Sequence, residues 1–241
     1  MPFLRRVLLA ALFAGVLSGG FAALLHQIAT VPLILEAEQY ERAAGHAAEN
    51  AVSHAAPANS AATAGHHEHD AAWEPETRLE RVIFTFAADL LAGIGFALLL
   101  AAGMALRGDE VAWREGLFWG LAGFLAVTVA PGLGLPPEVP GTEAAALLSR
   151  QLWWVATAGM TASALALLAF TRQKLIAAAA VALLVLPHLY GAPVPDHEAA
   201  VAPASLARQF VVTATVASFL FWAALGAATG YFYDRFGRRA V

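Results

Sequence analysis

The densest group of side chains that could bind a metal ion lies in a short hydrophilic stretch, AGHHEHDAAW, at residues 64–73. Imidazole nitrogens and carboxylate oxygens at close spacing chelate divalent ions such as zinc, nickel, cobalt or copper. The stretch therefore predicts a metal-capture segment; the alternative is a solvated polar loop in which histidine is merely frequent. The candidate ligands are His66, His67, His69 and Asp70.

A second candidate, Asp89, lies inside an apolar run that begins at Val82. At a helical rise of 1.5 Å per residue, Asp89 falls roughly 12 Å below Arg81. An ionisable side chain at that depth of a membrane predicts a site for a cation in transit or for a proton. The alternative is a structural hydrogen bond to a neighbouring helix, in either protonation state.

Two histidines and two glutamates lie near the ends of apolar runs. His26 and His188 could simply reach lipid headgroups, yet His188 follows Pro187, which interrupts the helical hydrogen-bond ladder. Irregular backbone at membrane depth is tolerated where it lines a cavity. Glu36 and Glu38 either line an outer vestibule or face water. We therefore predict one outer mouth, which combines His26, Glu36, Glu38, Asp89 and His188, with Asp196 and His197 as further members.

The composition is that of a polytopic membrane protein. Of 241 residues, 59% are hydrophobic, only 13% are charged and none is cysteine. Disulfides and thiolate metal sites are therefore excluded, and a net charge of −4 gives no indication of a nucleic-acid partner. The only lysine, Lys174, has no P-loop around it, so the chain is not a P-loop ATPase. No catalytic motif is present, and we expect no enzyme.

Six apolar segments are long enough, or nearly so, to cross a bilayer as helices. They run at about 7–28, 82–106, 116–135, 152–170, 175–190 and 210–232, of which the fifth is the shortest. With the N-terminus inside, nine arginines and lysines face the cytoplasm and five face outside. The positive-inside rule then places both termini in the cytoplasm. A signal peptide cleaved within residues 18–23 is the alternative, which the long apolar run disfavours.

The expected fold is therefore all-α: one membrane domain over residues 1–241, with the 36–80 segment outside. Residues 36–80 have too few large apolar side chains to form a core and predict a mobile outer loop, with a helix in the first half as the alternative. Three glycine pairs predict close helix crossings, unless their spacing arises by chance in a glycine-rich chain. They are Gly15/Gly19, Gly116/Gly120 and Gly226/Gly230.

Several phrases, in their order along the chain, resemble the CbtA family, the larger membrane subunits of predicted bacterial cobalt transporters. They are VPLILEAEQYE, the histidine-rich stretch followed by AWEP, GIGFALLLAAGMAL, WGLAGF, APGLGLPPEVPG, RQLWWVATA and LPHLYGAP. The resemblance implies a location in the bacterial cytoplasmic membrane, five to six spans, cobalamin-related cobalt uptake and a small single-span CbtB partner subunit. It makes Co²⁺ the favoured substrate, with Ni²⁺ or Zn²⁺ as alternatives, and implies no permanently bound cofactor.

Two functions follow as hypotheses. The first is a subunit for divalent-metal uptake, which is driven by an ion gradient or by partners because the chain has no ATPase motif. The second is a membrane-anchored metal buffer or sensor that binds ions without moving them. We expect a homo-oligomer as a further form of assembly in the bilayer.

Overall fold

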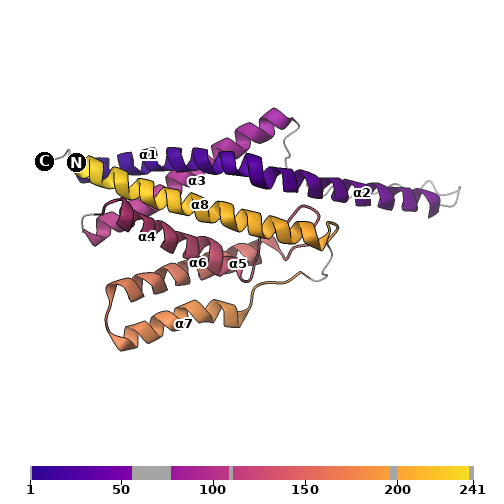
Figure 1. The fold of residues 1–241 in the computed structure, drawn as a ribbon. Coiled ribbons are helices and arrows are strands. Elements are labelled where there is room, and N and C mark those ends of the chain that lie inside the picture. The colour runs from indigo at the N-terminus through magenta and orange to yellow at the C-terminus, as the bar shows by residue number, and fades with distance from the viewer. Residues whose placement is uncertain (1, 56–76, 109–110, 196–199, 239–241) are drawn as a thin grey trace.

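The computed structural model describes residues 2–55, 77–108, 111–195 and 200–238, with side chains omitted at 2 and 48–55. These residues form helices and no strand; one antiparallel bridge joins Thr142 to Ala200. The all-helical fold expected from the sequence is confirmed (Figure 1). The elements are α1 Pro2–Leu25, η1 His26–Thr30, α2 Val31–Ala55, α3 Arg78–Arg107, α4 Trp113–Phe124, η2 Leu125–Val129, α5 Ala130–Gly132, α6 Leu147–Phe170, α7 Lys174–Tyr190 and α8 Ala204–Gly237.

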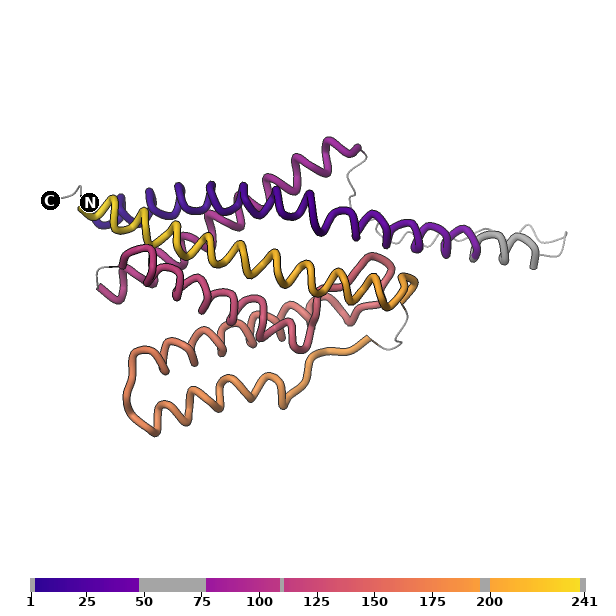
Figure 2. The backbone as a smooth tube through the Cα atoms, viewed as in Figure 1, coloured from indigo at the N-terminus to yellow at the C-terminus, as the bar shows by residue number. Residues whose placement is uncertain are grey.

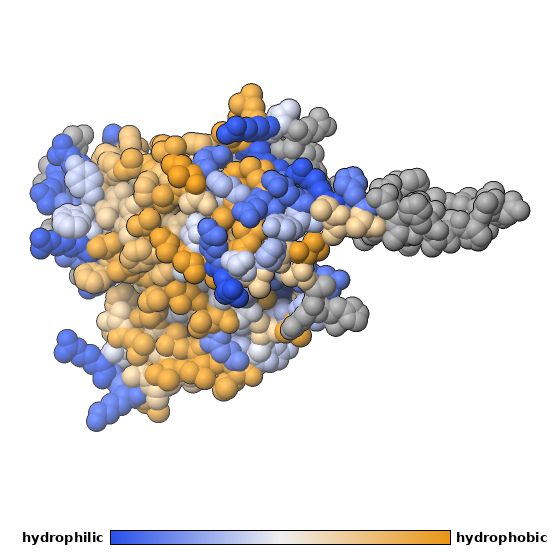
Figure 3. Space-filling view, turned by 45° about the vertical axis from the view of Figure 1, so that its right-hand side comes forward, coloured by the Kyte–Doolittle hydropathy of each residue, from blue (hydrophilic) through white to orange (hydrophobic). Residues whose placement is uncertain are grey.

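The helices suit a membrane in length and composition. Within the described residues, five helical segments are long and apolar enough to cross a bilayer. The sixth predicted span, α7, is apolar but has only 17 residues. Figure 3 shows an apolar band over the bundle with polar residues toward both ends, as expected for a protein that faces hydrocarbon in the middle and water at each side.

The first three elements form one continuous helix, so the first half of the 36–80 segment adopts the helical alternative and not the predicted loop. Residues 36–55 belong to α2 and residues 78–80 belong to α3, while 56–76 lie outside the described residues. The cause is helix propensity: the segment is rich in alanine and glutamate, which favour helix in water as well as in lipid. An ion pair between Glu38 and Arg42, one turn apart at 3.0 Å, adds to it. Figure 2 shows α2 extending beyond the bundle as a stalk.

Local signals fix both ends of α3. The Thr77 hydroxyl accepts a hydrogen bond from the Glu80 amide, and the Glu80 carboxylate accepts one from the Thr77 amide. This capping box satisfies donors that the first helical turn leaves open. At the other end Gly108 has φ 79°, a left-handed conformation that glycine adopts at little cost. The capping box and the glycine thus define the residues at which α3 begins and ends.

Glycines form two close helix crossings, so the predicted glycine pairs are confirmed as contacts. Where α1 crosses α3, a Cβ at Gly93 would lie 2.6 Å from the Gly15 carbonyl oxygen. Where α4 crosses α8, Gly116 and Gly120 face Gly226 and Gly230; a Cβ on either α4 glycine would lie 2.8 Å from a glycine Cα of α8. Backbones that approach this closely gain dispersion contacts in lipid, where burial of apolar surface supplies little.

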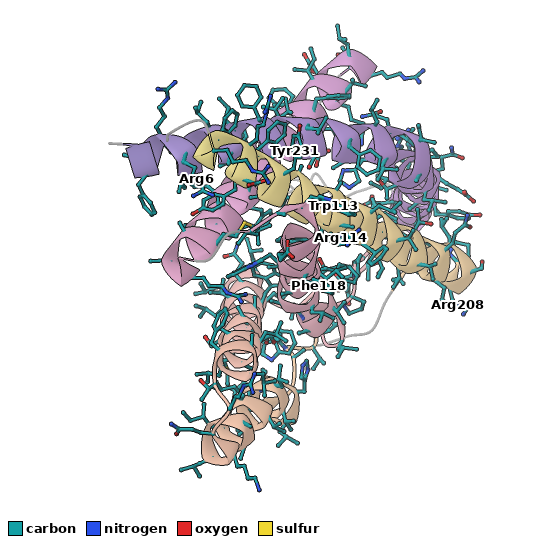
Figure 4. The ribbon with its side chains drawn as sticks, turned by 60° about the vertical axis from the view of Figure 1, so that its left-hand side comes forward. Arg6, Trp113, Arg114, Phe118, Arg208 and Tyr231 are labelled. Carbon is teal, nitrogen blue, oxygen red and sulfur yellow. The ribbon has the colours of Figure 1, made fainter. Side chains whose placement is uncertain are left out.

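The start of α1 and the end of α8 lie side by side. Arg6 Nε donates a hydrogen bond of 2.7 Å to the Tyr233 carbonyl oxygen, and its guanidinium lies 3.7 Å from the centre of the Tyr233 ring. Figure 4 shows Arg6 beside the last turns of α8 and Arg208 at the opposite end of that helix. The chain thus begins and ends at the same face of the bundle.

Helices α6 and α7 form a hairpin at the edge of the bundle. α7 packs on α6 and on no other described helix to a comparable extent. In Figures 1 and 2 the pair lies on the far side of α4 and α8 from α1. Side chains on α7 are therefore separated from the α1–α3 crossing, which affects which predicted site residues can meet.

Candidate metal site

The crossing of α1 and α3 brings His26 and Asp89 together. Asp89 lies four residues from Gly93, one turn along the same face of α3, and His26 lies seven residues from Gly19, two turns along the same face of α1. A Cβ at Gly19 would lie 2.5 Å from the Asp89 carbonyl oxygen, so the two backbones touch at this level. The close contact aligns both faces, and His26 Nδ1 lies 2.9 Å from Asp89 Oδ2.

The pair is partly enclosed. The Asp89 side chain is 16% exposed and the His26 side chain is 35% exposed, so one side of the imidazole remains accessible. Asp89 lies 11 residues into α3, or about 16 Å along the helix. A carboxylate at such depth is costly unless it is hydrogen-bonded or binds a cation. The imidazole supplies the hydrogen bond, and the open side leaves room for a ligand.

His26 is also the first residue of a π-helical turn, η1. The Thr30 hydroxyl donates to the His26 carbonyl oxygen at 3.2 Å, and the Val31 amide donates to the same oxygen. Beside it, the buried Gln27 amide nitrogen has no hydrogen-bond partner among the described residues. Short π-helical turns inside α-helices often occur at functional sites, because the wider turn re-aims side chains.

The hydrogen bond determines what the imidazole can do. When Nδ1 carries the proton, it donates to the Asp89 carboxylate and leaves the Nε2 lone pair available. A carboxylate that accepts from one ring nitrogen fixes the tautomer and the orientation of the ring. The arrangement thus offers a nitrogen ligand at Nε2, while the Asp89 carboxylate at Nδ1 orients the ring and adds negative charge from its other side.

The two predicted glutamates lie outside this pair. The Glu38 carboxylate binds Arg81 of α3 at 2.8 Å as well as Arg42, so it joins the stalk to α3 and its charge is already compensated. It lies 12 residues from His26, about 18 Å along the helix. Glu36 is exposed. Neither glutamate is a third ligand for an ion at His26.

His188 belongs to a different part of the molecule. Its ring packs edge-on against Trp153 of α6, with ring centres 6.1 Å apart. The Trp153 Nε1–H donates to the Pro187 carbonyl oxygen at 3.3 Å, an oxygen that also accepts from the Gly191 amide at 3.1 Å. The single outer mouth predicted from the sequence therefore does not form within one chain: His26 and Asp89 meet, and His188 lies in the α6–α7 hairpin.

The remaining predicted ligands lie outside the described residues, and the structure does not test them. They are His66, His67, His69, Asp70, Asp196 and His197. Within the part of the chain that the structure describes, no group of three or more histidine, aspartate or glutamate side chains is positioned to hold a metal ion. The His26–Asp89 pair is thus a two-residue site.

The sequence placed both members of this pair in one predicted outer mouth but did not indicate their direct contact. Each had been singled out by residue type and depth, on separate helices. The missing signal was the glycine spacing: Gly15 and Gly19 lead to His26 on one face of α1, and Gly93 leads to Asp89 on one face of α3. Two glycine faces that each end in a polar side chain predict that these side chains meet.

Comparison with known proteins identifies the family. The family model described as "Probable cobalt transporter subunit (CbtA)" matches residues 4–234, nearly the whole chain. The comparisons with curated proteins and with solved structures gave no match. The apolar helices fit the membrane location that a transporter requires. The chain therefore belongs to the CbtA family of probable cobalt transporter subunits.

Proposed function

We propose that this chain mediates uptake of divalent cobalt across the bacterial cytoplasmic membrane, and that the ion meets the His26–Asp89 pair on its way. The observation that carries the proposal is the 2.9 Å contact between an imidazole and a carboxylate at membrane depth, in a member of a cobalt-transporter family. Arginines at the shared end of α1 and α8 support a cytoplasmic position for both termini.

The ligands of the His26–Asp89 pair suit the passage of a metal ion better than its storage. Cobalt(II) accepts imidazole nitrogen and carboxylate oxygen, and so do nickel and zinc. With Asp89 held at Nδ1, the pair supplies one nitrogen ligand and a compensating charge, and it leaves the other coordination positions to water or to a partner subunit. An ion held by so few protein ligands leaves readily, which a transport site requires and a storage site does not.

Partners and energy source follow from what the sequence lacks. The chain has no P-loop, so any ATP hydrolysis that drives transport must be carried out by another subunit. A membrane subunit described as part of a transporter needs at least one companion. We propose a small single-span CbtB-like subunit as that companion, with an ion gradient as the alternative source of energy.

We propose that the histidine-rich stretch captures metal outside. Replacing His66, His67 and His69 together with alanine is expected to lower initial cobalt uptake several-fold at scarce metal and to leave it unchanged at saturating metal. A capture segment raises the local ion concentration and matters only when ions are few. Uptake curves over a range of cobalt concentrations measure this. Replacing His46 and His54 with alanine is the matched control, and an equal loss there would contradict capture by the 64–73 stretch.

The transport proposal is tested directly by metal accumulation. Cells that produce the chain with its small partner are expected to accumulate more cobalt, by mass spectrometry of washed cells, than cells without it. Proteoliposomes containing both subunits should take up cobalt into the lumen. Metal bound to the protein without lumenal cobalt would support the buffer or sensor function instead, and no difference in either assay would overturn uptake.

A further inference from the structure

Two phrases that the metal site does not use meet to form a pocket at the α2 end of the bundle. The loop after α5, with GLGLPPE, faces the first two turns of α6, with RQLWW. Together with η2 and one side of α8 they enclose a partly open cavity of about 590 Å³, here called the lateral pocket. Its rim carries Glu138 and Arg150, and its wall includes Trp154, Val155, Val211 and Thr215.

The lateral pocket is polar at its rim and apolar in its depth. At the rim, Arg150 Nη2 lies 2.7 Å from Glu138 Oε2, and the two side chains are 29% and 28% exposed. The rest of the lining is mostly apolar, with four valines from η2, α6 and α8 and three leucines, and it includes Thr128 and Gln151 as further polar members. The Thr215 hydroxyl is already used, because it donates to the Val211 carbonyl oxygen at 2.7 Å. Beyond the rim the lining offers a metal ion no carboxylate or imidazole ligand, and its apolar majority suits an acyl chain.

The depth range of the lateral pocket matches that of one leaflet of a lipid bilayer. Arg150 lies in the first turn of α6, where the helix leaves the loop region. Thr215 lies 11 residues into α8, roughly 16 Å along that helix. The pocket thus extends from headgroup level to acyl-chain level, beside Trp154, a residue type that favours the membrane interface.

The rim ion pair has unused hydrogen-bonding capacity of both signs. Among the described residues Arg150 makes one hydrogen bond, through Nη2, although a guanidinium carries five N–H donors. Glu138 uses Oε2 and leaves Oε1 available. An anion beside Arg150 and an ammonium beside Glu138 would each gain a charge-assisted hydrogen bond while the pair stays intact.

We propose that the lateral pocket binds phosphatidylethanolamine. Its phosphate would accept hydrogen bonds from Arg150, its primary ammonium would donate to Glu138, and an acyl chain would fill the apolar depth. Phosphatidylcholine has the same phosphate but no N–H to donate. Phosphatidylglycerol has a net negative charge and no ammonium, so Glu138 repels it. The rim therefore selects for a primary ammonium and not for a phosphate alone.

Native mass spectrometry of the purified full-length chain tests the proposal, with dioleoyl phosphatidylethanolamine, phosphatidylcholine and phosphatidylglycerol added in separate titrations. We expect wild-type protein to retain phosphatidylethanolamine roughly tenfold better than the other two lipids, as one charge-assisted hydrogen bond allows. Arg150→Gln should lower retention of all three lipids. Glu138→Gln should abolish the difference between ethanolamine and choline lipids and raise retention of phosphatidylglycerol.

Two further variants separate the pocket from general surface charge. Val211→Trp, which fills the apolar depth, should lower retention of all three lipids while both rim charges remain. Arg238→Gln, at the opposite end of α8, is the control and should behave as wild type. Equal retention of the three lipids by wild type would overturn the proposal. It would also be overturned by an ethanolamine preference that survives both rim substitutions, or by a loss in Arg238→Gln equal to that in Arg150→Gln.

Discussion

Replacing Asp89 with asparagine is expected to lower cobalt uptake about tenfold or more at every metal concentration. The substitution preserves the shape of the side chain and its capacity to accept a hydrogen bond from His26. It removes the negative charge that attracts the cation and orients the imidazole, a loss that corresponds to at least ~1.4 kcal/mol. Replacing His26 with alanine removes the nitrogen ligand and should have a similar effect.

The double variant and a matched control make this result specific. Because the two side chains act as one unit, the loss in the double variant should be close to that in either single variant rather than their product. Glu143→Gln, an exposed carboxylate on the same side of the bundle, should retain wild-type uptake. Membrane-inserted protein is quantified for each variant. Full uptake by the Asp89 and His26 variants would exclude the pair from the ion's path.

The second large effect is structural. Replacing Gly93 with leucine is expected to separate α1 from α3, because the new Cβ would lie 2.6 Å from the Gly15 carbonyl oxygen and 3.0 Å from the Gly19 Cα. Backbone atoms cannot give way as a flexible side chain can, so the cost should reach several kcal/mol. For a chain of this size the melting temperature should fall by roughly 10 °C or more.

Gly95→Leu is the matched control on the same helix. A Cβ there meets nothing within 4 Å, so the variant should unfold near the wild-type temperature. Thermal unfolding of the purified proteins in detergent, followed by circular dichroism, compares them. Gly93→Leu should also lose cobalt uptake, since the crossing positions His26 against Asp89. Similar melting temperatures for the two variants would show that the crossing contributes little to stability.

Hydropathy predicted the membrane spans well but not the ends of the helices. The last span was expected at about 210–232, and α8 runs from Ala204 to Gly237. Its extra turns carry Arg208, Asp234 and Arg235, which a hydropathy criterion counts against a span although polar side chains at helix ends reach water easily. The same limit explains why residues 36–55 were predicted as a loop. Low hydropathy excludes a segment from the hydrocarbon core of the membrane, but it does not prevent the segment from forming a helix.

The candidate site was predicted in its parts but not in its assembly. Residue type and depth singled out Asp89, His26 and His188 without any knowledge of helix neighbours. All three lie in the same half of the membrane by topology, which made a common mouth plausible. Helix adjacency decides the matter, however, and α7 packs against α6 rather than α1 or α3. Adjacency depends on complementary surfaces of two helices, which the hydropathy of a single segment does not reveal.

The unbroken helix from α1 through η1 to α2 also acts as a strut. It is held at the glycine crossing at Gly19 and again farther along, where Glu38 pairs with Arg81 of α3 at 2.8 Å. Between these two points, Leu33 and Ala37 of the same helix are buried against the bundle. A helix that is held at two points cannot pivot about either of them, so His26, which lies between the two, keeps its 2.9 Å contact with Asp89 when the tip of the stalk moves in water.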